Sequence, residues 1–287
     1  MKFGKFEVDV LDTGLFGLDG GAMFGVVPKT IWSKLYNHGD DLNRIPLAAR
    51  PMLIRYGDKK ILVDTGNGTK YNEKLVQIYN FDLEKGNLDY SLSKIGISRN
   101  EITDVILTHL HFDHCGGAVS KINDQLFPTF KNATYWTNKN HWDIALKPNA
   151  REKASFLKEN MLPLQEHGQL KFINQEVEPT LSDKIKIKIV HGHTESMMLP
   201  LIHYNDKTIL YCADLIPSMF HISLPWVMAY DMQPLATLTE KESILNEAFD
   251  KKWLLFFEHD LQNECCTLVK TERGIRQGEV LKLADVN

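Results

Sequence analysis

The chain has 287 residues, 43% hydrophobic and 24% charged, which is enough apolar material for a sizeable core without disulfide support. The net charge of −4 comes from 37 acidic and 33 basic residues without long single-sign runs, which argues against nucleic acid and membrane partners. Residues 1–10 lack the apolar run of a signal peptide, and four cysteines fit no disulfide-framework spacing. We therefore expect a cytoplasmic protein with reduced, buried thiols.

Alternating and apolar runs predict a series of strands along the chain. A Gly57–Asp58 turn and an Asn205–Asp206 turn, each between two such runs, indicate β-hairpins. The predicted strands span residues 6–11, 51–56, 60–63, 101–107, 133–136, 184–190, 198–204, 208–211 and 253–257, and the residues after 259 are also typical of strands.

Two helices are predicted between these strands. The first spans residues 151–166, with Pro163 expected to end or kink it, and the second spans 238–250, with Thr239 as its N-cap. No solenoid-length repeat and no Pro-, Gly- or Ser-rich linker interrupts the chain, so we expect one domain over residues 1–287. Hairpins with interspersed helices indicate an α/β or α+β fold.

The main chemical signal is the segment THLHFDHCGG, which directly follows an apolar run. It places His109, His111, Asp113 and His114 within six residues. Imidazole and carboxylate groups are the ligands that zinc, iron and manganese take in proteins. Because Asp113 and His114 are adjacent, they face directions different from the His109–His111 pair. The spacing therefore favours two neighbouring metals over one.

Three further candidate ligands also stand where a predicted strand ends and a loop begins. They are His193 in VHGHT, Asp214 in ILYCAD and His259 in LLFFEHD. Strand ends of this kind can converge on one rim of a pair of sheets. We expect these residues to complete the site that the THLHFDH segment begins.

The ordered series THLHFDH, GHT, ILYCAD and EHD resembles the metallo-β-lactamase superfamily, and Asp64 in ILVDTG matches that family's earlier strand-end aspartate. This resemblance implies an α+β fold, a four-layered αββα sandwich in a single domain, with a dinuclear metal site. It implies two divalent ions as cofactors, with zinc favoured over iron, manganese or cobalt. The GHT match selects His193 over the nearby His191. Asp64 is expected to contact the metal ligands and orient them without binding a metal itself.

The resemblance also implies how the ligands are shared between the two metals. The implied ligands are His109, His111 and His193 for the first metal, Asp113, His114 and His259 for the second, and Asp214 as the bridge between them.

Within the superfamily, residues 18–29 and 213–231 resemble N-acyl homoserine lactonases and methyl-parathion-hydrolase-like enzymes. This implies a hydrolase in which a water activated by the metals opens a lactone or ester, with Asp113 and Asp214 as catalytic carboxylates. Pro217 stands where lactonases of this kind carry a tyrosine that contacts the substrate carbonyl. Tyr230 or His221, in the same segment, are the candidate replacements.

Two apolar segments are interpreted as the walls of a pocket for an acyl chain or another apolar group of a small-molecule substrate. The alternatives are core packing for individual members and a contact in a homodimer. The residues concerned are Met23, Phe24, Phe220, Leu224, Trp226 and Met228.

Two other functions remain open at this point. A phosphotriesterase-like hydrolase would use the same metal ligands, so only the substrate separates it from a lactonase. A non-catalytic metal-binding module is the third hypothesis, and the seven expected ligands argue against it because purely structural sites are normally closed and four-coordinate.

Overall fold

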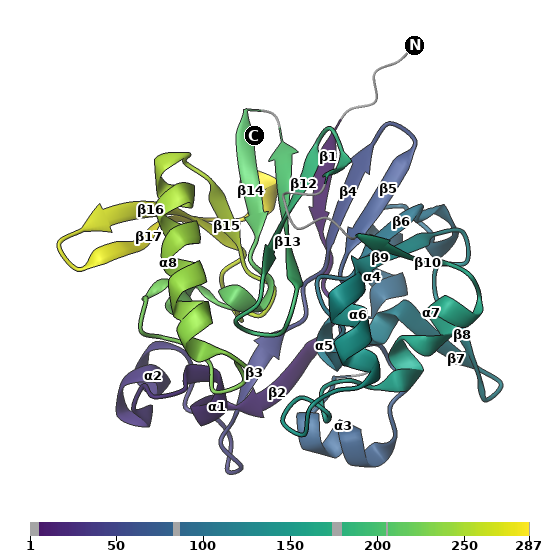
Figure 1. Ribbon diagram of the computed structural model, residues 1–287, viewed down its shortest axis with the longest axis horizontal. Helices are drawn as coiled ribbons and strands as arrows, with labels where there is room; N and C mark the ends of the chain where they lie inside the picture. Colours follow the sequence, from purple (N-terminus) through teal and green to yellow (C-terminus); the bar gives the residue numbers. More distant parts are fainter. Residues whose placement is uncertain (1–5, 83–86, 174–179, 205, 287) are drawn as a thin grey trace. The chain divides into compact units, whose positions relative to one another are not determined.

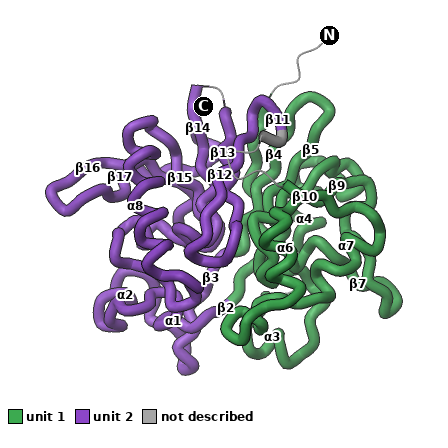
Figure 2. The backbone as a smooth tube through the Cα atoms, in the orientation of Figure 1, with its two compact units in different colours: residues 1–16, 49–179 green, residues 17–48, 180–287 purple. Residues whose placement is uncertain are grey.

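The computed structural model describes residues 6–82, 87–173, 180–204 and 206–286. It divides into two compact units, the first comprising residues 1–16 and 49–179 and the second residues 17–48 and 180–287 (Figure 2). The expectation of a single domain over residues 1–287 stays a prediction. Residues 1–5 and Asn205 of the expected Asn205–Asp206 turn lie outside the described residues.

The first unit contains a six-stranded sheet with the order β1-β4-β5-β6-β9-β10 (Figure 1). Its strands are β1 (Glu7–Val10), β4 (Met52–Tyr56), β5 (Lys59–Val63), β6 (Asp104–Ile106), β9 (Thr134–Asn138) and β10 (Leu170–Ile173). The pairs β1–β4 and β4–β5 are antiparallel, whereas β5, β6, β9 and β10 run parallel. The carboxyl ends of β5 and β6 therefore meet at one edge of this sheet, which places Asp64 beside the start of the histidine-rich loop.

Short helices and a hairpin complete the first unit. They are α3 (Glu73–Tyr79), α4 (Leu88–Lys94), α5 (Phe112–Cys115), α6 (Lys139–Leu146), α7 (Leu162–Glu166), the 3-10 turns η1 (Arg99–Glu101), η2 (Gly116–Ala118) and η3 (Lys158–Asn160), and the paired strands β7 (Val119–Ile122) and β8 (Gln125–Pro128). The core joins apolar residues of the sheet to those of α6, with Leu62, Val105, Tyr135 and Trp142 all buried. This packing gives the loop after β6 a rigid base.

The second unit contains a seven-stranded sheet with the order β11-β12-β13-β14-β15-β16-β17 (Figure 1). Its strands are β11 (Thr180–Ser182), β12 (Ile185–Val190), β13 (Met197–Tyr204), β14 (Lys207–Tyr211), β15 (Leu254–Phe256), β16 (Cys265–Thr271) and β17 (Gly274–Leu281). All neighbours pair antiparallel except β14 and β15, which are parallel. The loops that follow β14 and β15 consequently leave the same edge, and they carry Asp214 and His259.

The remaining elements of the second unit include one long helix. They are α1 (Gly20–Phe24), α2 (Lys29–Leu35), α8 (Pro234–Asp250), the 3-10 turns η4 (Ala213–Leu215), η5 (Met219–Ile222) and η6 (Leu283–Asp285), and β3 (Arg44–Ala48), which pairs with β2 (Leu15–Asp19). Helix α8 packs against β16 and β17. Among the described residues, no helix combines the length and apolar character that a membrane span needs.

The predicted strands agree with the structure to within a few residues. The hairpin around Gly57–Asp58 is formed by β4 and β5, and the residues after 259 form the hairpin β16–β17. The strand predicted at 101–107 is shorter, since residues 99–101 form a 3-10 turn before β6 begins at Asp104. All four cysteines are buried and free of disulfides, as expected.

The helix predicted over residues 151–166 is wrong. The structure has turns from 151 to 155, a 3-10 turn at Lys158–Asn160, and only then the short helix α7. Asn149 Oδ1 accepts hydrogen bonds from the backbone amides of Arg151 and Glu152, so the chain follows an Asn-induced turn instead of a helix. Pro163 lies in the first turn of α7, where its missing N–H costs nothing, so it begins a helix where we expected it to end one.

The start of the second predicted helix is also wrong. Helix α8 begins at Pro234, four residues before the expected position, with proline in its first turn. Thr239 is therefore an interior residue and not an N-cap, and its hydroxyl donates to the Leu235 carbonyl one turn earlier. The predicted end at Asp250 agrees with the structure.

Candidate metal centre

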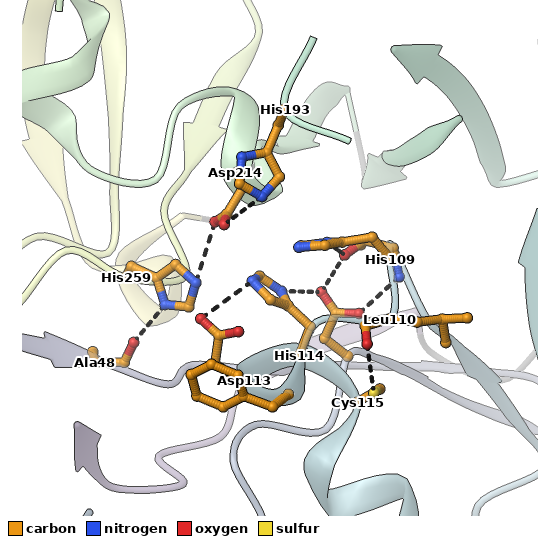
Figure 3. Close-up of polar contacts among 12 residues, drawn as sticks. Ala48, His109, Leu110, Asp113, His114, Cys115, His193, Asp214 and His259 are labelled. Carbon is orange, nitrogen blue, oxygen red and sulfur yellow. Dashed lines mark hydrogen bonds and ion pairs between the residues drawn. The ribbon is translucent and has the colours of Figure 1, made fainter. Parts of the chain in front are cut away.

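The first unit gathers four buried donor side chains in the loop and turn that follow β6. His109 and His111 lie on the loop, and Asp113 and His114 lie on α5, which begins at Phe112. The ring centroid of His109 lies 4.6 Å from that of His111 and 3.9 Å from that of His114. His114 Nε2 lies 3.8 Å from Asp113 Oδ2 (Figure 3).

Asp64 fixes the orientation of His114. Its Oδ2 lies 3.1 Å from His114 Nδ1, and its two oxygens accept bonds from the amide (2.8 Å) and the hydroxyl (2.7 Å) of Thr108. Asp64 is fully buried and has a left-handed φ of 56°, which aspartate tolerates better than most residues. A carboxylate on Nδ1 keeps the proton on that nitrogen and leaves Nε2 as the metal donor.

His109 is oriented by the same network. Its Nδ1 lies 3.1 Å from the Thr108 hydroxyl oxygen, whose own proton is directed to Asp64. This arrangement makes Nδ1 of His109 the donor and Nε2 the atom available to a metal. His111 differs, because its Nε2 lies 3.9 Å from the buried carboxylate of Glu152, which is beyond hydrogen-bond distance.

The backbone between His109 and His111 is held by His141, a residue that the sequence analysis did not assign to the site. Leu110 N donates a 2.8 Å bond to Nε2 of His141, a fully buried residue of α6. Cys115 Sγ donates to Leu110 O (Figure 3). Tyr71 Oη donates to Phe112 O one turn further on. His141 and Glu152 lack any motif context, so no local signal in the sequence assigns them to this site.

The second unit gathers the other three donors, His193, Asp214 and His259, all buried. Asp214 Oδ2 lies 3.1 Å from His193 Nε2, and Asp214 Oδ1 lies 3.2 Å from His259 Nε2 (Figure 3). The two oxygens of one carboxylate thus face two different imidazoles.

The opposite ring nitrogens of these two histidines are bound by other groups of the same unit. His193 Nδ1 lies 2.9 Å from Asp231 Oδ1, and His259 Nδ1 lies 2.8 Å from the carbonyl oxygen of Ala48. Burial alone would lower the pKa of His193, but the carboxylates of Asp214 and Asp231 outweigh it and raise that pKa to about 10. Asp231 was not identified from the sequence, because it follows no strand and belongs to no motif.

The donor set of each unit fits divalent metal ions. Within each unit, the facing donor atoms of His109 and His111, of Asp113 and His114, and of His193 and Asp214 lie within 4.8 Å of one another and are buried. Four of the histidines direct Nδ1 to a carboxylate, hydroxyl or carbonyl oxygen, which is how metal-binding histidines are usually held. Mixed imidazole and carboxylate donors suit zinc, iron and manganese.

His191, the competing candidate, lies apart from this donor set. Its Nδ1 is 2.6 Å from Glu195 Oε1, and its side chain is 46% exposed, whereas that of His193 is 2% exposed. The structure thus places His193, and not His191, beside Asp214.

The segment after Asp214 uses His221 for packing. Its Nε2 donates to Met23 O at 2.9 Å, Ser218 Oγ donates to its Nδ1 at 2.7 Å, and its ring stacks on Phe24 at 5.0 Å. Both ring nitrogens are therefore engaged within the second unit, which leaves His221 poorly suited to contact a substrate. Tyr230, the other candidate, is partly exposed, and its role stays a prediction.

The apolar residues proposed as pocket walls fall into two groups. Met23, Phe24 and Met228 are buried, and Phe24 packs among aromatic rings at 5.2 Å from Trp32 and 5.6 Å from Trp226, so these three belong to the core of the second unit. The partly exposed members are Phe220, Leu224 and Trp226.

The environment of His221 predicts a pH-dependent stability. Burial, aided by the positive charge of Lys241, lowers the pKa of His221 to about 4 from an ordinary value of 6.5, against the opposing charge of Asp214. Between these values the unfolded chain binds a proton that the folded chain does not, so stability falls as the pH falls. We expect the free energy of unfolding to fall by about 2 kcal/mol between pH 7.5 and pH 5 because of this group.

Urea unfolding of the chelator-treated protein at the two pH values measures this effect. His221→Phe, which keeps a ring beside Phe24, should lose about 2 kcal/mol less than the wild type over the same interval. Equal losses in the two proteins would show that His221 does not titrate in this way.

Comparison with known proteins places this donor set in a family. Residues 45–259 match the metallo-beta-lactamase superfamily. The chain belongs to the metallo-β-lactamase superfamily. The mixed α/β structure is the metallo-β-lactamase fold, which confirms the expected fold class, and the prediction of a hydrolytic enzyme is confirmed with it.

Several solved structures share this metallo-β-lactamase fold. A probable metal-dependent hydrolase from Staphylococcus aureus has 26% sequence identity and a TM-score of 0.86, covering 98% of this chain and 100% of that one. AidC, a dizinc quorum-quenching lactonase, has 24% identity and a TM-score of 0.78, covering 99% and 97%. A quorum-quenching N-acyl homoserine lactone hydrolase has 21% identity and a TM-score of 0.69, covering 91% and 94%.

Proposed function

We propose that this metallo-β-lactamase is a dinuclear metal-dependent hydrolase that opens N-acyl homoserine lactones or related lactones and esters. The observation that carries the dinuclear part is the carboxylate of Asp214, whose two oxygens face Nε2 of His193 and Nε2 of His259. A single metal would need only one of these oxygens. A carboxylate whose two oxygens each face a different imidazole is suited to bind a pair of ions.

The proposed ligands follow the order of the family's motifs along the chain, and zinc is the favoured metal. They are His109, His111 and His193 for one ion, Asp113, His114 and His259 for the other, and Asp214 for both.

When bound, the two ions would supply Lewis-acid activation of a water molecule and of the substrate carbonyl. Asp214 would take the proton released during attack and pass it to the leaving alkoxide, because it is the acidic group shared by both ligand sets. Asp113, whose Oδ2 lies 3.8 Å from His114 Nε2, would contribute a negative charge to the site. Tyr230 would contact the substrate carbonyl, in place of the tyrosine that lactonases carry at the position of Pro217.

The proposed substrate is a small molecule with an apolar group. Phe220, Leu224 and Trp226 are the partly exposed apolar side chains of the segment that follows Asp214, and they would contact that group. The AidC structure is a complex with a product of the acyl homoserine type, which supports the choice of an acylated lactone as the first compound to test.

Proton release from a long-chain N-acyl homoserine lactone tests this function, because ring opening produces a carboxylic acid that ionises. Metal-reconstituted protein should release protons at a rate proportional to enzyme concentration, and chelator-treated protein should not. A phosphotriester assayed in parallel is the comparison substrate. Protein that holds two metals and hydrolyses the phosphotriester but no lactone would overturn the lactonase proposal in favour of a phosphotriesterase.

A further inference from the structure

The loop that carries His193 is held by one short segment of the second unit. This loop joins β12 to β13, and residues 231–240 contact it repeatedly. Met232 N donates to His193 O at 3.0 Å, and Gln233 N donates to Gly192 O at 2.8 Å. Asp231 binds Nδ1 of the His193 ring itself, at 2.9 Å. Both the ring and the carbonyl groups of the loop are therefore positioned from outside it.

Glu240, on α8, binds the amide side of the same loop. Its Oε1 accepts from His191 N at 2.8 Å, and its Oε2 accepts from Gly192 N at 2.9 Å. One carboxylate thus binds two consecutive backbone amides with separate oxygens. Hydrogen bonds to an ionised acceptor are stronger than neutral ones, so this contact restrains the two residues that precede His193.

The close approach of α8 to the loop explains the residue type at position 192. A Cβ atom on Gly192 would lie 2.3 Å from both the amide nitrogen and the hydroxyl oxygen of Thr237. Only glycine allows the helix to come this near, and this proximity brings Glu240 within reach of the two amides. The Gly192 and Glu240 positions are therefore geometrically coupled.

We propose that Glu240 is a positioning residue for the metal ligand His193. Its carboxylate fixes the backbone of residues 191 and 192, while Asp231 fixes the ring, so that Nε2 of His193 is presented to Asp214. The proposal rests on the proposed metal centre for its consequence, but its geometry lies wholly within the second unit. A loop that is fixed before metal binding loses less freedom when the metal binds, so its affinity is higher.

Glu240→Gln tests this role because glutamine has nearly the same shape but only one acceptor oxygen. The side-chain NH2 of the glutamine would then face one of the two backbone amides, donor against donor, and the loop would shift. We expect the affinity for zinc, measured by competition with a chromophoric chelator, to fall about 10-fold, as for other residues that orient a metal ligand. Amide hydrogen exchange at residues 191 and 192 should become faster in the metal-free protein. Turnover should fall with little change in KM.

Glu247→Gln is the matched control. Glu247 lies seven residues further along α8, is partly buried like Glu240, and pairs with Lys188 of β12 at 3.0 Å without a described bond to the 191–193 backbone. The same chemical change at this position should leave zinc affinity within about twofold of the wild type, since it leaves the orientation of the ligand unaltered.

Two outcomes would overturn the inference. Unchanged zinc affinity in Glu240→Gln would do so, even with faster exchange at residues 191 and 192, because the contact would then be merely structural. An equal loss of affinity in Glu247→Gln would assign the effect to general loosening of α8. Wild-type protein that binds no zinc would refute the proposed metal centre instead, and the two failures are therefore distinguishable.

Discussion

An Asp214→Ala variant is expected to fold and to lose hydrolytic activity by on the order of 10³-fold, about 4 kcal/mol of transition-state stabilisation. The reason is that one side chain faces both His193 and His259, so its removal disturbs the ligand sets proposed for both ions. Metal content should fall below two ions per chain. Steady-state kinetics, metal analysis and circular dichroism on the same preparation measure the three effects.

Asp231→Asn is the informative comparison for this variant. Asp231 contacts Nδ1 of His193 and acts on the proposed centre through that ring. Loss of such an orienting group typically lowers metal affinity or activity 10- to 100-fold, so this variant should remain clearly more active than Asp214→Ala. Near-normal turnover by a folded Asp214→Ala protein with two bound metals would refute the bridging role.

The donor residues were predictable from the sequence because their signal is local. His109 to His114 stand within six residues, and His193, Asp214 and His259 each follow an apolar strand whose end the sequence reveals. Parallel pairing of β14 with β15 then brings the last two to one sheet edge. Strand ends and motif spacing therefore nominate most of the candidate donors, and the resemblance of GHT to the superfamily's motif was needed to choose His193 over His191.

The residues that hold these donors were not predictable in the same way. His141 binds the Leu110 amide from 31 positions away, Asp231 binds His193 from 38, and Glu240 binds His191 from 49. Each contact depends on how a helix or turn packs, and no sequence period encodes it. The misassigned helix over 151–166 has the same origin, since Asn149 and the buried Glu152 shape that segment through contacts and not through helical propensity.

The position of Asp64 could be found from the sequence, but its contacts and its backbone conformation could not. The sequence places it at the end of a strand, but only the structure shows that its carboxylate joins Thr108, and through Thr108 His109, to His114. The residue also adopts a left-handed φ of 56° directly after β5. Such a conformation costs of order 1 kcal/mol or more and persists where surrounding contacts hold it in place.

Asp64→Ala and Asp64→Asn should therefore differ sharply. Alanine leaves the buried Thr108 amide without its acceptor and disfavours the left-handed backbone, so we expect a loss of about 3 kcal/mol or more in the free energy of unfolding of the metal-free protein. Asparagine tolerates this backbone and keeps one acceptor oxygen for the Thr108 amide. Its stability loss should be smaller, and urea unfolding in the presence of a chelator measures both variants.

The asparagine variant should nevertheless lose metal affinity. Its amide group presents a donor where Asp64 Oδ2 now meets His114 Nδ1 and the Thr108 hydroxyl, so the proton pattern that leaves Nε2 of His114 and His109 as metal donors is no longer enforced. A 10- to 100-fold weaker zinc affinity is expected by chelator competition. An Asp64→Asn protein with wild-type affinity would mean that packing alone orients the two rings, and the carboxylate would then serve stability only.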